Sequence, residues 1–178
     1  MSKWIHTEIY KSPLGELILG SFKDQLCLCD WRYRKSRESI DRRIQGALKA
    51  SYVEAGSKLN EECVKQLEQY FTGERKEFDL SILLVGSDFQ KKVWNLLMEI
   101  PYGKTLSYAS LSKRLGDELA IRAVARANGD NALSIIVPCH RILGSDGSLT
   151  GYAGGLRTKQ KLLQIEGSSL QQELNFDS

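Results

Sequence analysis

The sequence predicts an α+β protein in which a small antiparallel sheet is followed by a mainly helical part. Three observations carry this prediction: short β-rich segments fill the first third, amphipathic helical patterns follow, and almost every pattern after Ser87 is helical. We place an N-terminal mixed α/β domain with its linker at residues 1–84, a C-terminal helical domain at 85–167 and a polar tail at 168–178. With 178 residues, 42% of them hydrophobic and 26% charged, the chain can bury a core and has an ordinary globular composition.

Three short segments near the N-terminus have the composition of β-strands. They are rich in β-branched or aromatic residues, and the turn sequences Pro13–Gly15 and Lys23–Asp24 separate them. The predicted strands are Thr7–Lys11, Gly15–Ser21 and Gln25–Trp31. Because their connections are short, an antiparallel meander is the simplest arrangement.

Two amphipathic helices are predicted after these strands. Ser36–Leu48 has apolar residues at four-residue spacing. A second helix runs to Phe71, with Asn60 as its cap and Gly73 just beyond its end. Glu77–Leu83 is then either a strand or an extended linker.

Helical patterns dominate from Ser87 onward. Ser87 or Asp88 can cap a first helix, which Pro101-Tyr102-Gly103 ends. Two shorter helices joined by a glycine-containing turn then fit a helix-turn-helix, although many such pairs are only packing units. These helices are Thr105–Leu115 and Leu119–Asn128, their turn is Gly116–Glu118, and a last amphipathic helix follows Gly155.

The most informative stretch is Pro138-Cys139-His140-Arg141. The apolar run Leu133–Val137 before it predicts a short buried strand, and the glycine-rich segment 144–155 follows it. A cysteine beside a histidine at such a break is a candidate nucleophile, because the reacting thiolate needs a nearby proton acceptor or positive charge. A buried cysteine that acts as a small apolar residue is the alternative, and the tetrapeptide alone does not decide between them.

Charge and cysteine content limit the classes of function. The net charge is +3, and the segment from Ser87 to Gly167 holds eleven basic and seven acidic residues, which permits contact with a polyanion without requiring it. No apolar run is long enough to cross a bilayer, so we expect no membrane association. The cysteines do not have the pattern of a disulfide framework, so we expect an intracellular, reducing location: the cytoplasm, or the nucleus in a eukaryote. They are Cys27, Cys29, Cys63 and Cys139.

A series of motifs after Ser87 occurs in a characteristic order and spacing. They are Ser87-Asp88-Phe89-Gln90, Val93-Trp94, Ile100-Pro101-Tyr102-Gly103-Lys104-Thr105, Ser107-Tyr108, Arg122-Ala123-Val124, Asn131, Ile136-Val137-Pro138-Cys139-His140-Arg141 and Gly151-Tyr152-Ala153-Gly154-Gly155. Through these motifs, the segment from Ser87 to Gly167 resembles the O6-alkylguanine-DNA alkyltransferases. The resemblance implies a winged-helix-like C-terminal domain that carries the active-site cysteine.

The resemblance also implies a suicide repair reaction on DNA. Cys139 attacks the alkyl carbon on guanine O6 and keeps the group as a thioether, after the nucleotide has been flipped out of the duplex. A thioether cannot readily become a thiolate again, whereas a disulfide can be reduced, so each molecule acts once. No metal or organic cofactor is required. The implied partner is double- or single-stranded DNA that contains O6-alkylguanine, bound by a monomer.

The family assigns proton-transfer roles around this cysteine. His140 is the base, acting on Cys139 through a water and oriented by Glu166. Tyr108 donates toward the leaving guanine, and Lys159 lies near that tyrosine. Without the resemblance these would be an ordinary surface histidine, helix-end carboxylate, core aromatic and solvated lysine. The full catalytic set is Cys139, His140, Glu166, Tyr108, Lys159 and Asn131, in which the asparagine braces the turn below the cysteine.

DNA contacts are implied mainly for the second helix of the helix-turn-helix. Arg122 matches the finger that fills the gap left by the flipped base, and small residues after it allow close approach in the minor groove, where readout is degenerate. The implied DNA-binding residues are Arg122, Ala123, Ala125, Arg126, Ala127, Asn128 and Arg141. The implied substrate pocket is formed by Cys139, Ile142, Tyr152 and Ala153.

The chain departs from the family pattern at a few positions. Ala132 stands where proline is usual, Ala125 replaces a common glycine, and Asp130 adds a negative charge near the expected phosphate path. No chemical group is lost, so we expect only quantitative effects on DNA affinity. A structural metal at Cys27 and Cys29 is not expected, because a Cys-x-Cys pair inside a strand lacks the usual ligand spacing.

Two other functions are alternatives to alkyl transfer. The first is a non-catalytic sensor of alkylated DNA or a helix-turn-helix regulator, but such sensors lack the acceptor cysteine. The second is a cysteine hydrolase, which needs an oxyanion hole and leaves Tyr108, Arg122 and Asn131 without a role.

Overall fold

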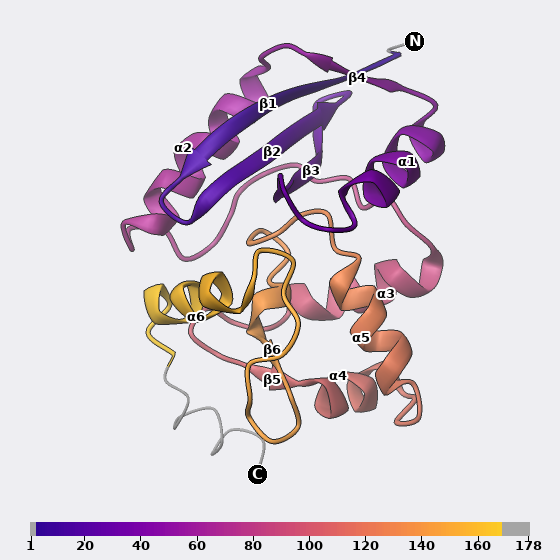
Figure 1. Ribbon diagram of the computed structural model, residues 1–178, viewed down its shortest axis with the longest axis vertical. Helices are drawn as coiled ribbons and strands as arrows, with labels where there is room; N and C mark the ends of the chain where they lie inside the picture. Colours follow the sequence, from indigo (N-terminus) through magenta and orange to yellow (C-terminus); the bar gives the residue numbers. More distant parts are fainter. Residues whose placement is uncertain (1–2, 169–178) are drawn as a thin grey trace. The chain divides into compact units, whose positions relative to one another are not determined.

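The computed structural model describes residues 3–168 of the chain. The chain divides into two compact units, Met1–Gly86 and Ser87–Ser178, which are described separately (Figure 1). Of the predicted polar tail, all but Ser168 lies outside the described residues. In the described part of the chain, no helix is both long and apolar enough to cross a membrane.

The first unit contains a four-stranded sheet with the strand order β3-β2-β1-β4. The predicted meander is confirmed, because β1 (Trp4–Ser12), β2 (Gly15–Phe22) and β3 (Gln25–Trp31) pair antiparallel in sequence order. The sequence missed β4 (Ser51–Glu54), which pairs parallel with β1. Four residues are too few to establish an alternating pattern, so this strand depends on its neighbour.

The β2–β3 turn shows how local sequence sets the hairpin. Lys23 and Asp24 both have positive φ values, 47° and 60°, so the two-residue loop has the mirror-image geometry that matches the twist of the flanking strands. Aspartate tolerates this conformation better than most residues, whereas lysine carries some strain there.

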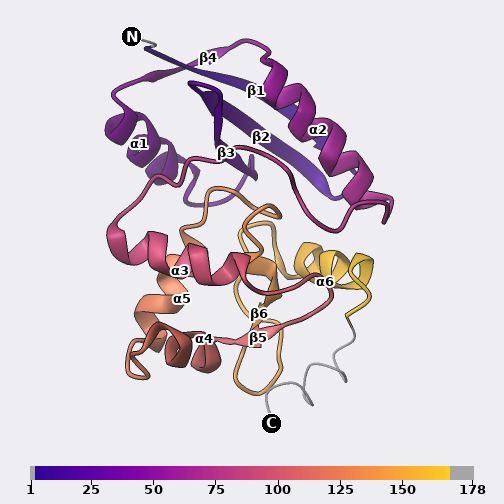
Figure 2. The same ribbon diagram turned by 180° about the vertical axis from the view of Figure 1, so that it is seen from behind.

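Two helices complete the first unit, and α2 lies along the sheet in both ribbon views (Figure 1, Figure 2). The helix α1 (Arg37–Leu48) is close to its predicted range. The helix α2 (Lys58–Phe71) begins earlier than expected, because Ser57 rather than Asn60 caps it, with the serine hydroxyl accepting from the Asn60 amide at 3.0 Å. The Asn60 side chain is buried and donates to the His6 carbonyl at 3.0 Å, which ties α2 to β1.

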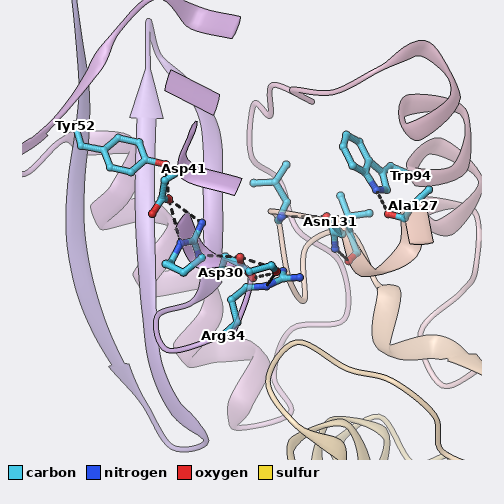
Figure 3. A network of polar contacts seen from close by, with 11 residues as sticks. Asp30, Arg34, Asp41, Tyr52, Trp94, Ala127 and Asn131 are labelled. Atoms are coloured by element: carbon cyan, nitrogen blue, oxygen red, sulfur yellow. Dashed lines mark hydrogen bonds and ion pairs between the residues drawn. The ribbon is translucent and has the colours of Figure 1, made fainter. Parts of the chain in front are cut away.

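A buried carboxylate organises the end of this sheet (Figure 3). Asp30 on β3 is fully buried and accepts hydrogen bonds from Arg34 at 3.1 Å and Arg37 at 2.8 Å. Arg37 also donates to Asp41, whose carboxylate accepts from the Tyr52 hydroxyl at 2.8 Å. This cluster, which we call the Asp30 cluster, joins β3, α1 and β4.

The segment after α2 is extended rather than a regular strand. Ile82 forms one parallel bridge with Leu26 of β3, supported by hydrogen bonds from Leu26 to Ser81 and from Leu83 to Leu26, both of 2.8 Å. Because this bridge is isolated and lies outside any regular strand, the extended linker is the better description of the two alternatives.

Between residues 87 and 168, the second unit has four helices, a short 3-10 turn and two very short strands. Ser87 caps the first helix through a complete capping box, in which its hydroxyl accepts from the Gln90 amide and the Gln90 side chain accepts from the Ser87 amide. The predicted cap is confirmed. The helices are α3 (Asp88–Met98), α4 (Tyr108–Leu115), α5 (Ile121–Gly129) and α6 (Leu156–Ile165).

The helix-turn-helix expected from the sequence is formed by α4 and α5. Gly116 ends α4 with a φ of 90°, and Trp94 of α3 donates its indole N–H to the Ala127 carbonyl of α5 at 2.8 Å (Figure 3). The predicted first helix of the pair is shorter than expected, because its opening residues form β5 (Leu106–Ser107). This strand pairs parallel with β6 (Ile142–Leu143).

Candidate active site

The segment before Cys139 is a compact turn, and the predicted strand Leu133–Val137 is not formed. The Asn131 side chain closes the turn, donating to the Val137 carbonyl at 2.9 Å and accepting from the Leu133 amide at 3.0 Å (Figure 3). Ile135 has a φ of 73°, which no regular strand allows. The run is apolar because it is buried. The hydrogen bonds of the Asn131 side chain hold it in a loop conformation instead of a strand paired in a sheet.

Cys139 opens the 3-10 turn η1 (Cys139–Arg141) at the end of this loop. Its amide donates to the Val137 carbonyl at 2.8 Å, and the Asn128 side chain lies 3.5 Å from its carbonyl. The residue is only 4% exposed, so its sulfur lies in the interior of the unit rather than on an open surface. Asn131 and Asn128 therefore fix the backbone around the candidate nucleophile.

His140 and Glu166 form a buried pair next to this cysteine. His140 Nε2 lies 2.7 Å from Glu166 Oε1, and both side chains are fully buried. Burial disfavours the charged form of Glu166, but His140 and Arg141 outweigh it, so the pKa of Glu166 lies well below its ordinary value. Burial is also the main reason that the pKa of His140 is lowered.

These directions define the proton positions at neutral pH. Glu166 is a carboxylate that can only accept, so the neutral His140 carries its proton on Nε2 and donates it to Glu166. Among residues 3–168, Nδ1 of His140 has no hydrogen-bond partner. Its lone pair is therefore available as a proton acceptor on the residue that follows Cys139 in the chain.

Tyr108 and Lys159 converge on one residue that the sequence did not single out, Thr150. Lys159 of α6 is fully buried and donates to the Thr150 carbonyl at 2.8 Å. Burial raises the pKa of Tyr108, the Thr150 and Asn128 side chains lower it by hydrogen bonding, and Cys139 raises it. Tyr108 is therefore a protonated donor that lies within electrostatic range of Cys139. Thr150 has no sequence signal beyond its place in the glycine-rich loop.

The other residues predicted to form the substrate pocket lie around the same loop. Ile142 is buried in β6 and directly follows η1. Tyr152 and Ala153 are half-buried in the segment between β6 and α6. The helix α6 packs against η1. The segment between β6 and α6 therefore lies between the turn that carries Cys139 and His140 and the helix that Glu166 follows.

The residues expected to contact DNA fall into two groups. Arg122, Ala123 and Arg126 are exposed on α5, and Ala125 is half-buried. A groove of about 540 Å³ runs beside this exposed face, between α5 and the start of α3. It is lined by Ser87, Phe89, Gln90, Arg122, Ala123, Arg126, Ala127 and Asp130. The sequence did not suggest Phe89 and Gln90 as surface residues of this groove.

The side chains of Ala127, Asn128 and Arg141 are buried, unlike those of the other residues predicted to bind DNA. The carbonyl of Ala127 is taken by Trp94, and Asn128 lies under Cys139. The Arg141 guanidinium is bound inside the unit by Glu166 and the Ile100 carbonyl. Asp130, the unexpected negative charge, accepts from Gln90 at 3.1 Å.

The other cysteines lie in the first unit and are buried. Burial raises the pKa of the Cys27 thiol to about 12, and a hydrogen bond with Cys63, together with burial, raises the pKa of Cys29. These thiols are thus poor sources of thiolate at neutral pH. Within residues 3–168, no group of three histidine, cysteine or acidic side chains could hold a metal ion.

Comparison with known proteins gives matches over nearly the whole chain. Residues 88–168 match the DNA-binding domain of 6-O-methylguanine DNA methyltransferase, and residues 5–84 match the ribonuclease-like domain of the same family. The chain is 42% identical over 160 residues to the methylated-DNA–protein-cysteine methyltransferase of Methanosarcina acetivorans, covering 90% of this chain and 97% of that one. It is 40% identical over 175 residues to the protein of the same name from Mycobacterium tuberculosis, covering 97% and 98%.

Solved structures agree with these matches. The crystal structure of Mycobacterium tuberculosis OGT in complex with DNA has a TM-score of 0.77 at 38% identity, covering 90% of this chain and 92% of that one. The O6-methylguanine-DNA methyltransferase of Pyrococcus kodakaraensis, at 23% identity and a TM-score of 0.65, shares the fold.

Proposed function

This chain belongs to the 6-O-methylguanine DNA methyltransferase family, and we propose that Cys139 is the residue that accepts the alkyl group from O6-alkylguanine. The protein is a DNA-binding repair enzyme, which transfers a methyl group from methylated DNA to a cysteine of its own in a single turnover. The non-catalytic sensor considered from the sequence is not favoured, because the relatives are methyltransferases and the cysteine is present.

The observation that carries the assignment of Cys139 is its place beside the His140–Glu166 pair. A thiol becomes a nucleophile when a neighbouring base takes its proton. His140 is neutral, keeps its proton on Nε2 through Glu166, and has an acceptor at Nδ1. Cys27 and Cys29 have raised pKa values and no such histidine beside them in the sequence, so they are poorer candidates.

The proposed reaction moves one alkyl group and one proton at Cys139. His140 takes the thiol proton through a water, and the resulting imidazolium is stabilised by Glu166. The sulfur lone pair then forms the S–C bond while the C–O6 bond breaks, and its electron pair stays on the guanine. Tyr108, which is protonated at neutral pH, donates a hydrogen bond to this departing anion. Lys159 supports the same charge from its site at Thr150.

The low exposure of Cys139 has a consequence for the substrate. A purine inside a duplex cannot present its O6 substituent in line to the sulfur of a cysteine that is 4% exposed, so the nucleotide must be extruded. We infer that Tyr108 and the segment between β6 and α6, with Tyr152 and Ala153, shift to admit the base. Asn131 and Ile142 keep the floor of the pocket in place.

The exposed face of α5 is the proposed DNA-binding surface. Arg122 and Arg126 provide positive charge there, while Ala123 and Ala125 allow the DNA backbone to approach. We assign Arg122 as the residue that fills the gap left by the extruded nucleotide. The active unit is proposed to be a monomer, because Cys139, His140 and Glu166 all come from one chain. A cytoplasmic, reducing setting is proposed because it would keep Cys139 as a thiol.

The test is methyl transfer from a duplex that contains O6-methylguanine to Cys139→Ser, with Cys27→Ala as the matched control. We expect no transfer to the serine variant, since its hydroxyl is a far weaker nucleophile, while DNA binding remains measurable. The control should react at the rate of the natural chain. Transfer that persists in the serine variant would rule out Cys139 as the acceptor.

A further inference from the structure

The side chain of Arg141 is turned into the second unit and joins three segments. Its Nε donates to Glu166 Oε2 at 2.9 Å, and Nη2 donates to Glu166 Oε1 at 2.9 Å. Its Nη1 donates to the carbonyl of Ile100, which follows α3, at 2.7 Å. The Tyr102 ring centre lies 5.8 Å from the guanidinium carbon. This arginine, two residues after Cys139, is therefore held by hydrogen bonds inside the second unit.

The two bonds to Glu166 have a specific geometry. A planar guanidinium that meets both carboxylate oxygens fixes the plane of the carboxylate as well as its position, which a lysine cannot do. Oε1 of Glu166 is shared between Arg141 and His140, whose Nε2 lies 2.7 Å away. The orientation of the imidazole thus depends on a carboxylate that Arg141 holds.

We propose that Arg141 is a positioning residue for alkyl transfer: by holding both oxygens of Glu166, it keeps this carboxylate ionised and aligned with His140. His140 then retains its proton on Nε2 and can receive the Cys139 proton on Nδ1. This inference rests on the proposed function, in which His140 is the base. Arg141 acts through Glu166 and touches neither the substrate nor the sulfur in this role.

The charges around His140 indicate what losing Arg141 would do. Burial lowers the pKa of His140, Glu166 raises it, and Arg141 and Lys159 lower it. The other ionisable groups nearby are Cys139 on the same turn, Tyr108 of α4 near that thiol and Tyr102 beside the guanidinium. Removing the Arg141 charge therefore strengthens proton binding by the His140–Glu166 pair. The acid limb, which is the low-pH side of the profile of transfer rate against pH, then moves to higher pH.

The experiment measures single-turnover methyl transfer against pH for the full chain and two variants. In Arg141→Gln, which lacks the charge, we expect the acid limb to move up by about one pH unit. In Arg141→Lys, which keeps the charge but not the two-point contact, we expect a lower plateau and an unmoved limb. Arg157→Gln, which removes an exposed arginine from α6, is the matched control and should leave both unchanged.

Two results would overturn the inference. In the first, the acid limb of Arg141→Gln coincides with that of the natural chain, although the transfer rate and the melting temperature both fall. Arg141 would then be a packing residue only. The second is a limb that moves equally in Arg141→Gln and Arg141→Lys.

A double variant covers the case in which Arg141→Gln does not fold. Removing both charges with Arg141→Gln and Glu166→Gln avoids an unpaired buried ion. Its pH profile should equal that of Glu166→Gln alone, and any difference would contradict action through Glu166. Failure of the proposed function is recognised separately, by transfer that survives in Cys139→Ser.

Discussion

The two units each contain a buried carboxylate held by two basic side chains, but the second basic group differs. In the Asp30 cluster, both partners are arginines, Arg34 and Arg37. At Glu166, one partner is Arg141 and the other is His140. Arginine keeps its charge at every physiological pH, whereas histidine can gain or lose a proton. The first arrangement can only hold the fold together, and the second can also move a proton.

This difference shows why burial and ion pairing alone do not identify a catalytic site. Asp30 and Glu166 are both nearly inaccessible to solvent. Proton transfer is possible at Glu166 because its histidine partner has a second nitrogen without a hydrogen-bond partner among residues 3–168 and directly follows Cys139 in the chain. Removing one charge at a time from each unit tests this difference.

The largest effect is expected from Glu166→Gln. The amide cannot stabilise an imidazolium, so the single-turnover rate of methyl transfer should fall by about a hundredfold or more. Glu99→Gln, which neutralises an exposed carboxylate at the end of α3, serves as the control and should transfer normally. Equal rates for the two variants would remove Glu166 from the proton-transfer pathway.

Asp30→Asn is expected to lower the stability of the fold strongly without loss of methyl-transfer activity. Two half-buried arginines would lose the Asp30 charge, although Arg37 keeps Asp41, and we expect a cost of about 3 kcal/mol in the free energy of unfolding, measured by urea denaturation. Glu38→Gln breaks the exposed Glu38–Arg42 pair, whose side chains are 89% and 75% exposed, and should cost well under 1 kcal/mol.

The folded fraction of Asp30→Asn should still transfer a methyl group at close to the rate of the natural chain. A large loss of transfer rate in this variant under conditions where it is folded would contradict the purely structural role of the Asp30 cluster.

A smaller effect is expected on the acid side of the stability curve. The pKa of Glu166 is lower in the folded protein than its ordinary value of 4.5, so its contribution is fully present above that pH. As the pH falls below 4.5 toward the folded pKa, the carboxylate is protonated and this contribution is lost. The stability difference between the natural chain and Glu166→Gln should therefore shrink with acidification, as followed by thermal melts. A difference that grows on acidification would mean that the sign of the shift is wrong.

Local signals in the sequence predicted much of the fold. The hairpin at Lys23–Asp24 and the helix cap depend on neighbouring residues; the hairpin forms where expected, and Ser87 is the cap of the two candidates, Ser87 and Asp88. The strands β4, β5 and β6 were missed because they have only four, two and two residues, and each exists through a distant partner. The run Leu133–Val137 was misread because apolar composition reports burial and not backbone conformation.

The site was predictable only in part for the same reason. The adjacency of Cys139 and His140 is written in the sequence, but Glu166 lies 26 residues beyond His140 and was indicated only by family resemblance. Arg141 was expected among the DNA-binding residues from the family resemblance alone. Its true partner depends on how α6 packs against η1, which no local pattern encodes.

The most direct test of the whole account is the mass of the intact protein after reaction with excess DNA that contains O6-methylguanine. We expect one methyl group per molecule, and peptide mapping should place it on Cys139. A methyl group on any other residue, or turnover beyond one methyl per protein, would contradict the account.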